Sequence, residues 1–155
     1  MTVHSAGLLA FHRAGGLHVF LAHPGGPFFA RKDDGAWSLP KGVFDPATED
    51  AAAAARREFA EEIGVPAPEG ALLDLGTVTL KSRKVVHGFA VEAVPELTFA
   101  VSNTFELEWP RGSGRTRSYP EVDRAGWFTF AEAQTKLNSG QLPLLARLAA
   151  TDATT

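Results

Sequence analysis

The stretch from Glu49 to Pro66 constrains the fold of this chain more than any other. Residues 51–55 are five consecutive alanines, which favour a helix and leave room for close packing against a sheet. Gly64 suits the left-handed conformation that ends many helices, and Pro66 prevents the helix from continuing. A single well-defined helix is therefore expected in the first half of the chain.

The start of this helix is less sharply marked than its end. Asp45-Pro46 or Thr48 is a suitable first position, and either choice places the acids Glu49 and Asp50 in the first helical turn. Acidic side chains are favourable there because they face the positive end of the helix dipole.

The charge of the chain is concentrated in the same segment. The 155 residues carry 15 Lys and Arg against 18 Asp and Glu, a net charge of −3. Residues 49–62 contain five acids and two arginines, so the whole excess lies there and the remainder is balanced. Because the chain has no overall basic field, salt-driven binding of a nucleic acid polymer is not expected.

Three glutamates of the helix share one face. At about 100° per residue, Glu61 and Glu62 lie within about 60° of Glu58. The like-charged pair Glu58 and Glu62 costs an isolated helix roughly 0.2–0.5 kcal/mol. The C-terminal end of a helix is also unfavourable to anions. Two explanations remain open on spacing alone: a divalent cation bound by oxygen ligands, or neutralisation by Arg56, Arg57 or other basic groups.

Glu49 has a different place on the helical projection. It lies about half a turn from Glu58 but only about 80° from Arg57. We therefore expect Glu49 to pair with Arg57 rather than to join the three glutamates.

The rest of the chain alternates strands and helices. The predicted strands are residues 3–12, 17–23, 36–39, 72–80, 84–94, 105–109 and 122–130. Residues 111–119 are expected to form a loop, and residues 131–137 and 142–150 two helices. This order predicts an α/β fold, a mixed α/β/α sandwich, with one domain over residues 1–150 and a flexible tail at 151–155.

Composition excludes several classes of protein. The chain has no cysteine, so it has no disulfide framework, thiol nucleophile or thiolate metal site, which fits a reducing compartment. The apolar run at residues 6–11 is too short for a signal peptide and lacks preceding basic residues. No stretch approaches the roughly 20 apolar residues of a membrane span. We expect a soluble, cytoplasmic protein with no membrane partner.

The residues of the acidic helix carry a family resemblance. Gly42, Glu49 and the run Arg57-Glu58-Phe59-Ala60-Glu61-Glu62-Ile63-Gly64-Val65 resemble the Nudix box of the Nudix hydrolases. Six residues separate Gly42 from Glu49, where the usual pattern has five, and the extra residue falls before the helix. Residues 37–42 and 121–128 are also similar to family segments. The chain as a whole resembles bacterial proteins described as predicted nucleoside-triphosphate pyrophosphohydrolases of Nudix type.

The resemblance implies a fold, an activity and a set of site residues. The fold would be a Nudix-type α/β/α sandwich with a mixed central sheet, and the activity metal-dependent hydrolysis of a nucleoside diphosphate linked to a further group X. Glu58, Glu61 and Glu62 would bind Mg²⁺ or Mn²⁺, and Glu58 would also orient or deprotonate water. Arg57 would hold these glutamates in place, with Glu49 as a supporting residue. The substrate would be a small nucleotide, with nucleoside triphosphates and dinucleoside polyphosphates favoured.

Other residues are candidates for roles outside the box. In this family the general base often follows the box, and Glu121 is the first choice. Glu106 and Glu108 come next, with an exposed strand face as their alternative. Lys41 and Gly42 are assigned to substrate binding.

Basic residues in two predicted loops have two interpretations each. Arg115 and Arg117 either close over a substrate or lie in a solvated loop. Residues 81–84, a basic cluster, form either a hairpin turn or a phosphate contact.

Two alternatives to a hydrolase stay open at this stage. One is a non-hydrolytic nucleotide-binding or regulatory Nudix domain, and the other is a purely structural acidic helix. The sequence implies no oligomeric state.

Overall fold

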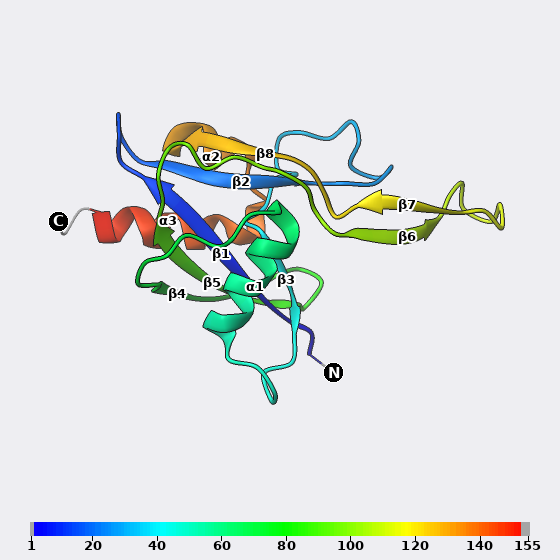
Figure 1. The fold of residues 1–155 in the computed structure, drawn as a ribbon, viewed down its shortest axis with the longest axis horizontal. Coiled ribbons are helices and arrows are strands. Elements are labelled where there is room, and N and C mark those ends of the chain that lie inside the picture. Colours follow the sequence, from blue (N-terminus) through cyan, green and yellow to red (C-terminus); the bar gives the residue numbers. More distant parts are fainter. Residues whose placement is uncertain (1, 153–155) are drawn as a thin grey trace.

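A mixed sheet forms the centre of the computed structural model, which describes residues 2–152. The sheet has six strands in the order β4-β5-β1-β2-β8, with β3 paired to β1 (Figure 1). Its strands are β1 (His4–His12), β2 (His18–Pro24), β3 (Lys41–Phe44), β4 (Leu73–Thr79), β5 (Val85–Glu92) and β8 (Val122–Thr129). The β1 and β5 strands run parallel, and the other pairs are antiparallel. A separate hairpin consists of β6 (Thr104–Glu108) and β7 (Thr116–Pro120).

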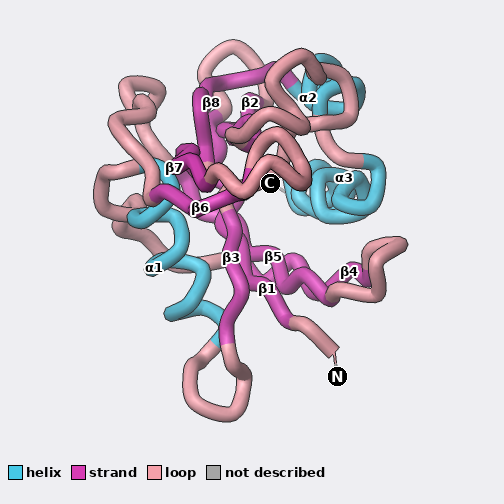
Figure 2. Tube along the Cα trace, turned by 90° about the vertical axis from the view of Figure 1, so that its right-hand side faces the viewer, coloured by secondary structure: helices cyan, strands magenta, loops and turns pink. Residues whose placement is uncertain are grey.

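Helices cover both faces of the sheet. Figure 2 shows α1 (Ala51–Ile63) on one side, and α2 (Phe130–Lys136) and α3 (Leu142–Asp152) on the other. A 3-10 turn, Ser139–Gln141, connects α2 to α3. The predicted α/β/α sandwich with a mixed sheet is thus confirmed.

The alternation of side chains along β1 explains why two cores form. Leu9 and Phe11 pack in the cluster under α2 and α3, whereas Leu8 and Ala10 pack in the cluster under α1. Successive side chains of a strand point to opposite faces, so an apolar strand such as β1 requires cover on both sides.

The acidic helix begins later than predicted. Its first residue is Ala51, and Asp50 is the N-cap, whose carboxylate accepts a hydrogen bond from the Ala53 amide. The prediction of a start at residues 45–48 was wrong, because Asp45 instead closes a turn by accepting hydrogen bonds from the Ala47 and Glu49 amides. Glu49 and Asp50 therefore precede the first helical turn.

Two strand assignments were also wrong. Residues 36–39 make only isolated bridges, and the ladder beside β1 is formed by Lys41–Phe44, directly after Pro40. Thr116–Pro120, expected within a loop, is a strand because it pairs along its whole length with Thr104–Glu108. Its polar and exposed residues lack the apolar alternation by which strands are recognised.

The remaining predicted strands and helices are present, with their ends shifted by a few residues. Thr151 and Asp152, assigned to a flexible tail, continue α3, and residues 153–155 lie outside the described residues. None of the helices within residues 2–152 is long and apolar enough to cross a membrane.

Gly64 offers a test of how the acidic helix is terminated. Its φ of 83° is left-handed, and an added Cβ would lie 2.3 Å from the carbonyl oxygen of Val101. We expect Gly64→Ala to lower the free energy of unfolding by more than the roughly 1–2 kcal/mol that left-handed backbone costs an alanine, because the loop at Val101 must also move. Urea unfolding measures this loss.

Gly112→Ala is the matched control. Gly112 also has a positive φ, 78°, but an added Cβ there meets no atom within 4 Å. Equal losses in the two variants would show that the contact with Val101 is unimportant.

Candidate active site

Arg57 is the centre of the ionic contacts around the acidic helix. Its guanidinium donates to both carboxylate oxygens of Glu49, each at 2.8 Å, to Glu58 at 2.8 Å and to Glu61 at 3.3 Å. The hydrogen bonds to Glu49 are the main reason that the pKa of Arg57 is raised and that of Glu49 lowered. The predicted pair between Glu49 and Arg57 is therefore present, and the extra residue between Gly42 and Glu49 does not prevent it.

Glu58 is held in a space that only a glycine leaves open. The residue is 9% exposed, and a Cβ added at Gly42 would lie 1.9 Å from its Oε2 atom. Burial is the largest cause of a raised pKa at Glu58, and the hydrogen bond from Arg57 opposes it. The backbone of β3 at Gly42 thus fixes where this carboxylate lies.

Glu62 is the most strongly perturbed carboxylate of the helix. Burial raises its pKa to about 7, and the negative charges of Glu121 and Glu58 add to the effect. The backbone amide of Lys41 donates to Glu62 at 3.3 Å and acts in the opposite direction. Glu62 is half-buried and has no ion pair within residues 2–152, which favours the binding of a proton or another cation.

These side chains line one cavity of about 440 Å³. It presents four carboxylates and two ammonium groups: Glu58, Glu61, Glu62, Glu121, Lys41 and Lys84. They come from α1, from β3, from the turn before β5 and from the residue after β7. The structure thus brings Glu121, Lys41 and Gly42 to the box glutamates.

Lys84 was assigned first to a hairpin turn, and residues 81–84 do form the turn between β4 and β5. The structure also places Lys84 in the cavity, where its charge, after burial, contributes to a lowered pKa of Lys41. The sequence signal for this position was the basic cluster itself.

The second and third choices for the general base lie elsewhere. Glu106 and Glu108 are exposed on β6 and do not line this cavity. The carboxylate of Glu108 accepts a hydrogen bond from the Gly112 amide at the hairpin tip. Arg115 and Arg117 are exposed on the same hairpin.

A second cavity, of about 390 Å³, continues the first. The two share Lys41, Glu62, Lys84 and Glu121. The far part is lined by Phe29, Asn138 and Gln141, which sequence reasoning did not identify. Gln141 is buried, and its side chain accepts from the Leu39 amide and donates to the Ser38 hydroxyl. The two cavities therefore adjoin at the four residues that they share.

A larger hollow, of about 1050 Å³, lies at the opposite end of β1. It is lined by residues such as His12, Val65 and Leu97 and by none of the box glutamates. This hollow is therefore not the candidate active site, although it is larger than the cavity of the box glutamates.

The donor groups of the 440 Å³ cavity fit a hard cation. Carboxylate oxygens are the ligands that Mg²⁺ and Mn²⁺ prefer. The buried hydroxyl of Ser5, which also lines the cavity, has no hydrogen-bond partner in the described part of the chain. As they stand, however, no three Asp, Glu or His side chains within residues 2–152 are grouped closely enough to hold a metal ion. Glu58 and Glu61 line the cavity and also accept hydrogen bonds from Arg57, so a cation bound there would share these carboxylates with the guanidinium.

Comparison with solved structures shows the same fold in several proteins. A C. elegans Ap4A hydrolase has a TM-score of 0.67 at 19% identity, with 97% of this chain and 99% of that chain covered. The NUDIX domain of Shewanella oneidensis NrtR, complexed with ADP ribose, has a TM-score of 0.63 at 18% identity, covering 100% and 90%. A mutT/nudix family protein from Listeria innocua has a TM-score of 0.61 at 18% identity, covering 98% and 94%.

Sequence comparison gives the family directly. No curated protein matches the chain. The family model of the NUDIX domain matches residues 1–148, which is nearly the whole chain. Since the fold of the solved relatives agrees with that match, this chain belongs to the NUDIX domain family.

Proposed function

We propose that this protein is a metal-dependent pyrophosphohydrolase that cleaves a P–O–P bond in a nucleoside diphosphate linked to a further group. Nucleoside triphosphates and dinucleoside polyphosphates are the favoured substrates. The observation that carries the proposal is the cavity that presents four carboxylates and two lysines together. Carboxylates alone would repel a phosphate chain, so their concentration beside lysines implies a bridging cation.

Glu58, Glu61 and Glu62 are the residues that would hold Mg²⁺ or Mn²⁺. Such an ion neutralises charge on the phosphate oxygens and makes bound water more acidic. Arg57 positions Glu58 and Glu61 through its hydrogen bonds, and Glu49 supports Arg57 from the other side. Arg57 and Glu49 are thus positioning residues.

The other side chains of the cavity act on water and phosphate. Glu121 is the proposed general base, because it lines the cavity and is close enough to Glu62 and Lys41 to affect their pKa values. Lys41 and Lys84 would bind phosphate oxygens. Gly42 permits the substrate and Glu58 to approach the backbone of β3.

A panel of nucleotides tests the proposal. The protein is incubated with nucleoside triphosphates, dinucleoside polyphosphates and ADP-ribose in the presence of Mg²⁺ or Mn²⁺, and products are identified in ¹⁸O-labelled water. Release of phosphate or pyrophosphate, abolished by a chelator, is the expected result. Tight nucleotide binding without turnover under either metal would instead support the alternative, a non-hydrolytic binding or regulatory domain.

Substitution of the proposed metal ligands is the next prediction. Glu61→Gln and Glu62→Gln should each lower kcat/KM by more than the roughly 10–100-fold that loss of an outer-shell residue costs. Calorimetric titration with Mn²⁺ should show weaker binding in both. Glu108→Gln, on the exposed hairpin, is the matched control and should behave as wild type. Unchanged activity in the two helix variants would refute their assigned role.

Glu121→Gln separates the general base from the metal ligands. The variant should lose about 10²–10⁴-fold in kcat, the usual contribution of general-base catalysis, while its Mn²⁺ affinity stays near that of wild type. If kcat falls by less than ten-fold, another group removes the proton. Glu106→Gln provides the control.

Gly42→Ala tests the close contact between β3 and the helix. The methyl group would occupy the position of the Glu58 carboxylate, so we expect a loss of about 10–100-fold in kcat/KM with little change in overall fold. The double variant Gly42→Ala/Glu58→Gln should lose no more than Glu58→Gln alone. Gly126→Ala, where an added Cβ meets no atom within 4 Å, should be neutral.

A further inference from the structure

The hairpin of β6 and β7 projects from the body of the protein (Figure 1). The residues at its base lie at the cavity of the box glutamates, the proposed catalytic cavity. Thr104, at the start of β6, lines the cavity, and Glu121 directly follows β7. The Glu121 amide donates to the Asn103 carbonyl at 2.7 Å, which closes the base of the hairpin. Strands of five residues extend about 17 Å, farther than the phosphate chain of a mononucleotide.

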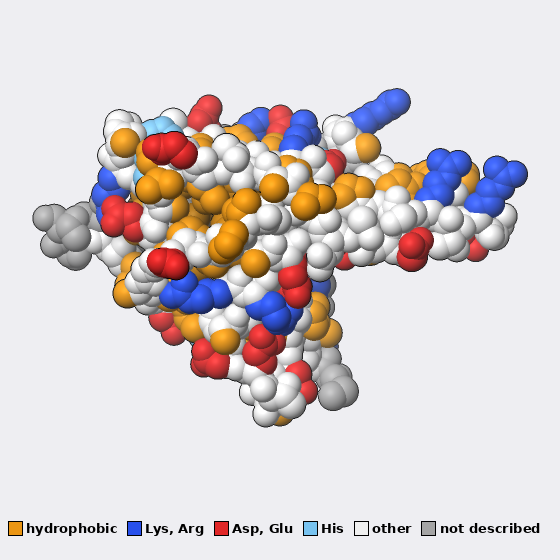
Figure 3. Space-filling view, viewed as in Figure 1, with side chains coloured by type: hydrophobic (Ala, Val, Ile, Leu, Met, Phe, Trp, Pro, Cys, Tyr) orange, Lys and Arg blue, Asp and Glu red, His pale blue; other side chains and the backbone are white. Residues whose placement is uncertain are grey.

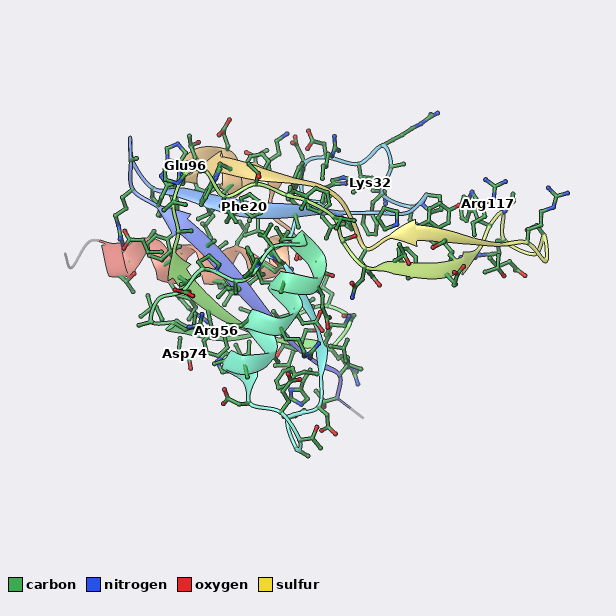
Figure 4. The ribbon with its side chains drawn as sticks, in the orientation of Figure 1. Phe20, Lys32, Arg56, Asp74, Glu96 and Arg117 are labelled. Atoms are coloured by element: carbon green, nitrogen blue, oxygen red, sulfur yellow. The ribbon has the colours of Figure 1, made fainter. Side chains whose placement is uncertain are left out.

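One side of this region is basic. Five exposed cations lie on the hairpin and on the loop beside it: Arg31, Lys32, Arg111, Arg115 and Arg117. We call these five residues the basic strip. None of them forms an ion pair with another residue of the described part of the chain. In Figure 4, Lys32 and Arg117 lie on the adjacent loop and on the hairpin respectively.

The acids of the region are separated from the basic strip. Arg117 pairs across the hairpin with Leu107, so Glu106 and Glu108 point to the other face. Figure 3 shows Lys and Arg along one edge of the projection and Asp and Glu along the opposite edge. On the adjacent loop, Asp33 and Asp34 are both bound by Lys136.

Aromatic rings connect the basic strip to the catalytic cavity. Phe28 is 48% exposed and Phe29 is 37% exposed. Phe28 contacts Trp109 of the hairpin edge to face, with ring centroids 5.1 Å apart, and Lys32 lies over the ring of Phe29. Phe29 also lines the cavity that shares Glu121 with the catalytic site. Phe28 and Phe29 therefore lie between Trp109 of the hairpin and the cavity that includes Glu121.

We propose that the basic strip and Phe28 bind a single-stranded oligonucleotide whose 5′ phosphate chain enters the catalytic cavity. Proteins bind single strands with a basic track that follows the backbone and with aromatic rings on which bases stack. Arginine is well suited to phosphate because its planar guanidinium donates two hydrogen bonds at once. A mononucleotide bound in the cavity would not contact the basic strip.

The proposal rests on the hydrolytic function proposed above. For a 5′-triphosphate end, water adds to the phosphorus nearest the ribose and the adjacent P–O–P bond breaks. The products are an oligonucleotide with a 5′-monophosphate and pyrophosphate, and Glu121 accepts the proton of the water. The proposal departs from the expectation, based on net charge, that nucleic acid polymers are not partners. The net charge shows no basic excess, but the fold places five basic side chains in one region.

The experiment compares three forms of the full chain: wild type, Arg111→Gln/Arg115→Gln/Arg117→Gln, and the same three positions changed to Lys. Substrates are a short 5′-triphosphorylated RNA or DNA strand and the matching mononucleotide triphosphate. We expect wild type to prefer the strand, with KM rising as salt is added. The Gln variant should raise the KM for the strand at least about ten-fold. It should also reduce the salt slope, the slope of log KM against the logarithm of the salt concentration, by about 2, since each phosphate contact contributes about 0.7. The Lys variant should retain the salt slope.

Mononucleotide turnover is the internal control and should be equal in all three forms. Phe28→Ala should weaken binding of the strand about ten-fold, as for loss of one stacked base. A strand that is turned over no better than the mononucleotide, or a KM unaffected by the Gln variant, would overturn the proposal. A difference in oligomeric state between wild type and the Gln variant would also overturn the proposal, because it would assign the arginines to a protein interface.

Direct binding keeps the two proposals distinguishable. Fluorescence anisotropy with a labelled strand on Glu61→Gln reports the basic strip without turnover. If the strand binds in an arginine-dependent way but wild type hydrolyses no nucleotide, strand binding by the basic strip is supported and the hydrolytic function is refuted. Hydrolysis of mononucleotides without arginine-dependent binding of the strand would do the reverse.

Discussion

The guanidinium of Arg57, shared among Glu49, Glu58 and Glu61, is the interaction on which the candidate site depends. One cation offsets part of the repulsion among the helix carboxylates and holds two of them beside β3. Among residues 2–152 Glu62 has no ion pair, and burial raises the pKa of that carboxylate to about 7. The cavity itself presents four carboxylates against two lysines, so negative charge predominates there.

The sheet determines where this excess lies. The β3 strand pairs with β1 and brings Gly42 against Glu58, and the missing Cβ leaves space for the carboxylate. On the other face of α1, Phe59 and Ile63 are fully buried in the core under the helix. Because packing density in a core leaves little freedom, the burial of Phe59 and Ile63 fixes the side of α1 that turns its carboxylates toward β3.

Several elements were predictable because their signals are local. The end of α1 at Gly64 and the presence of a strand at β1 follow from turn chemistry and apolar patterning. The start of α1 was misplaced because both Asp45 and Asp50 are good caps, and only the turn closed by Asp45 decides between them. The strand Thr116–Pro120 was missed because its ladder depends on a partner, Thr104–Glu108, and not on its own apolar residues.

The sequence by itself determined the helix, the shared face of Glu58, Glu61 and Glu62, and the family resemblance, because helical periodicity acts over a few residues. Only the tertiary structure decided which distant groups join them. Glu121 and Lys84 reach the cavity through the hairpin base and the turn before β5, and Glu106 and Glu108 do not. Burial, charge separation and the alignment of the basic strip likewise depend on contacts between segments far apart in the chain, which no local pattern encodes.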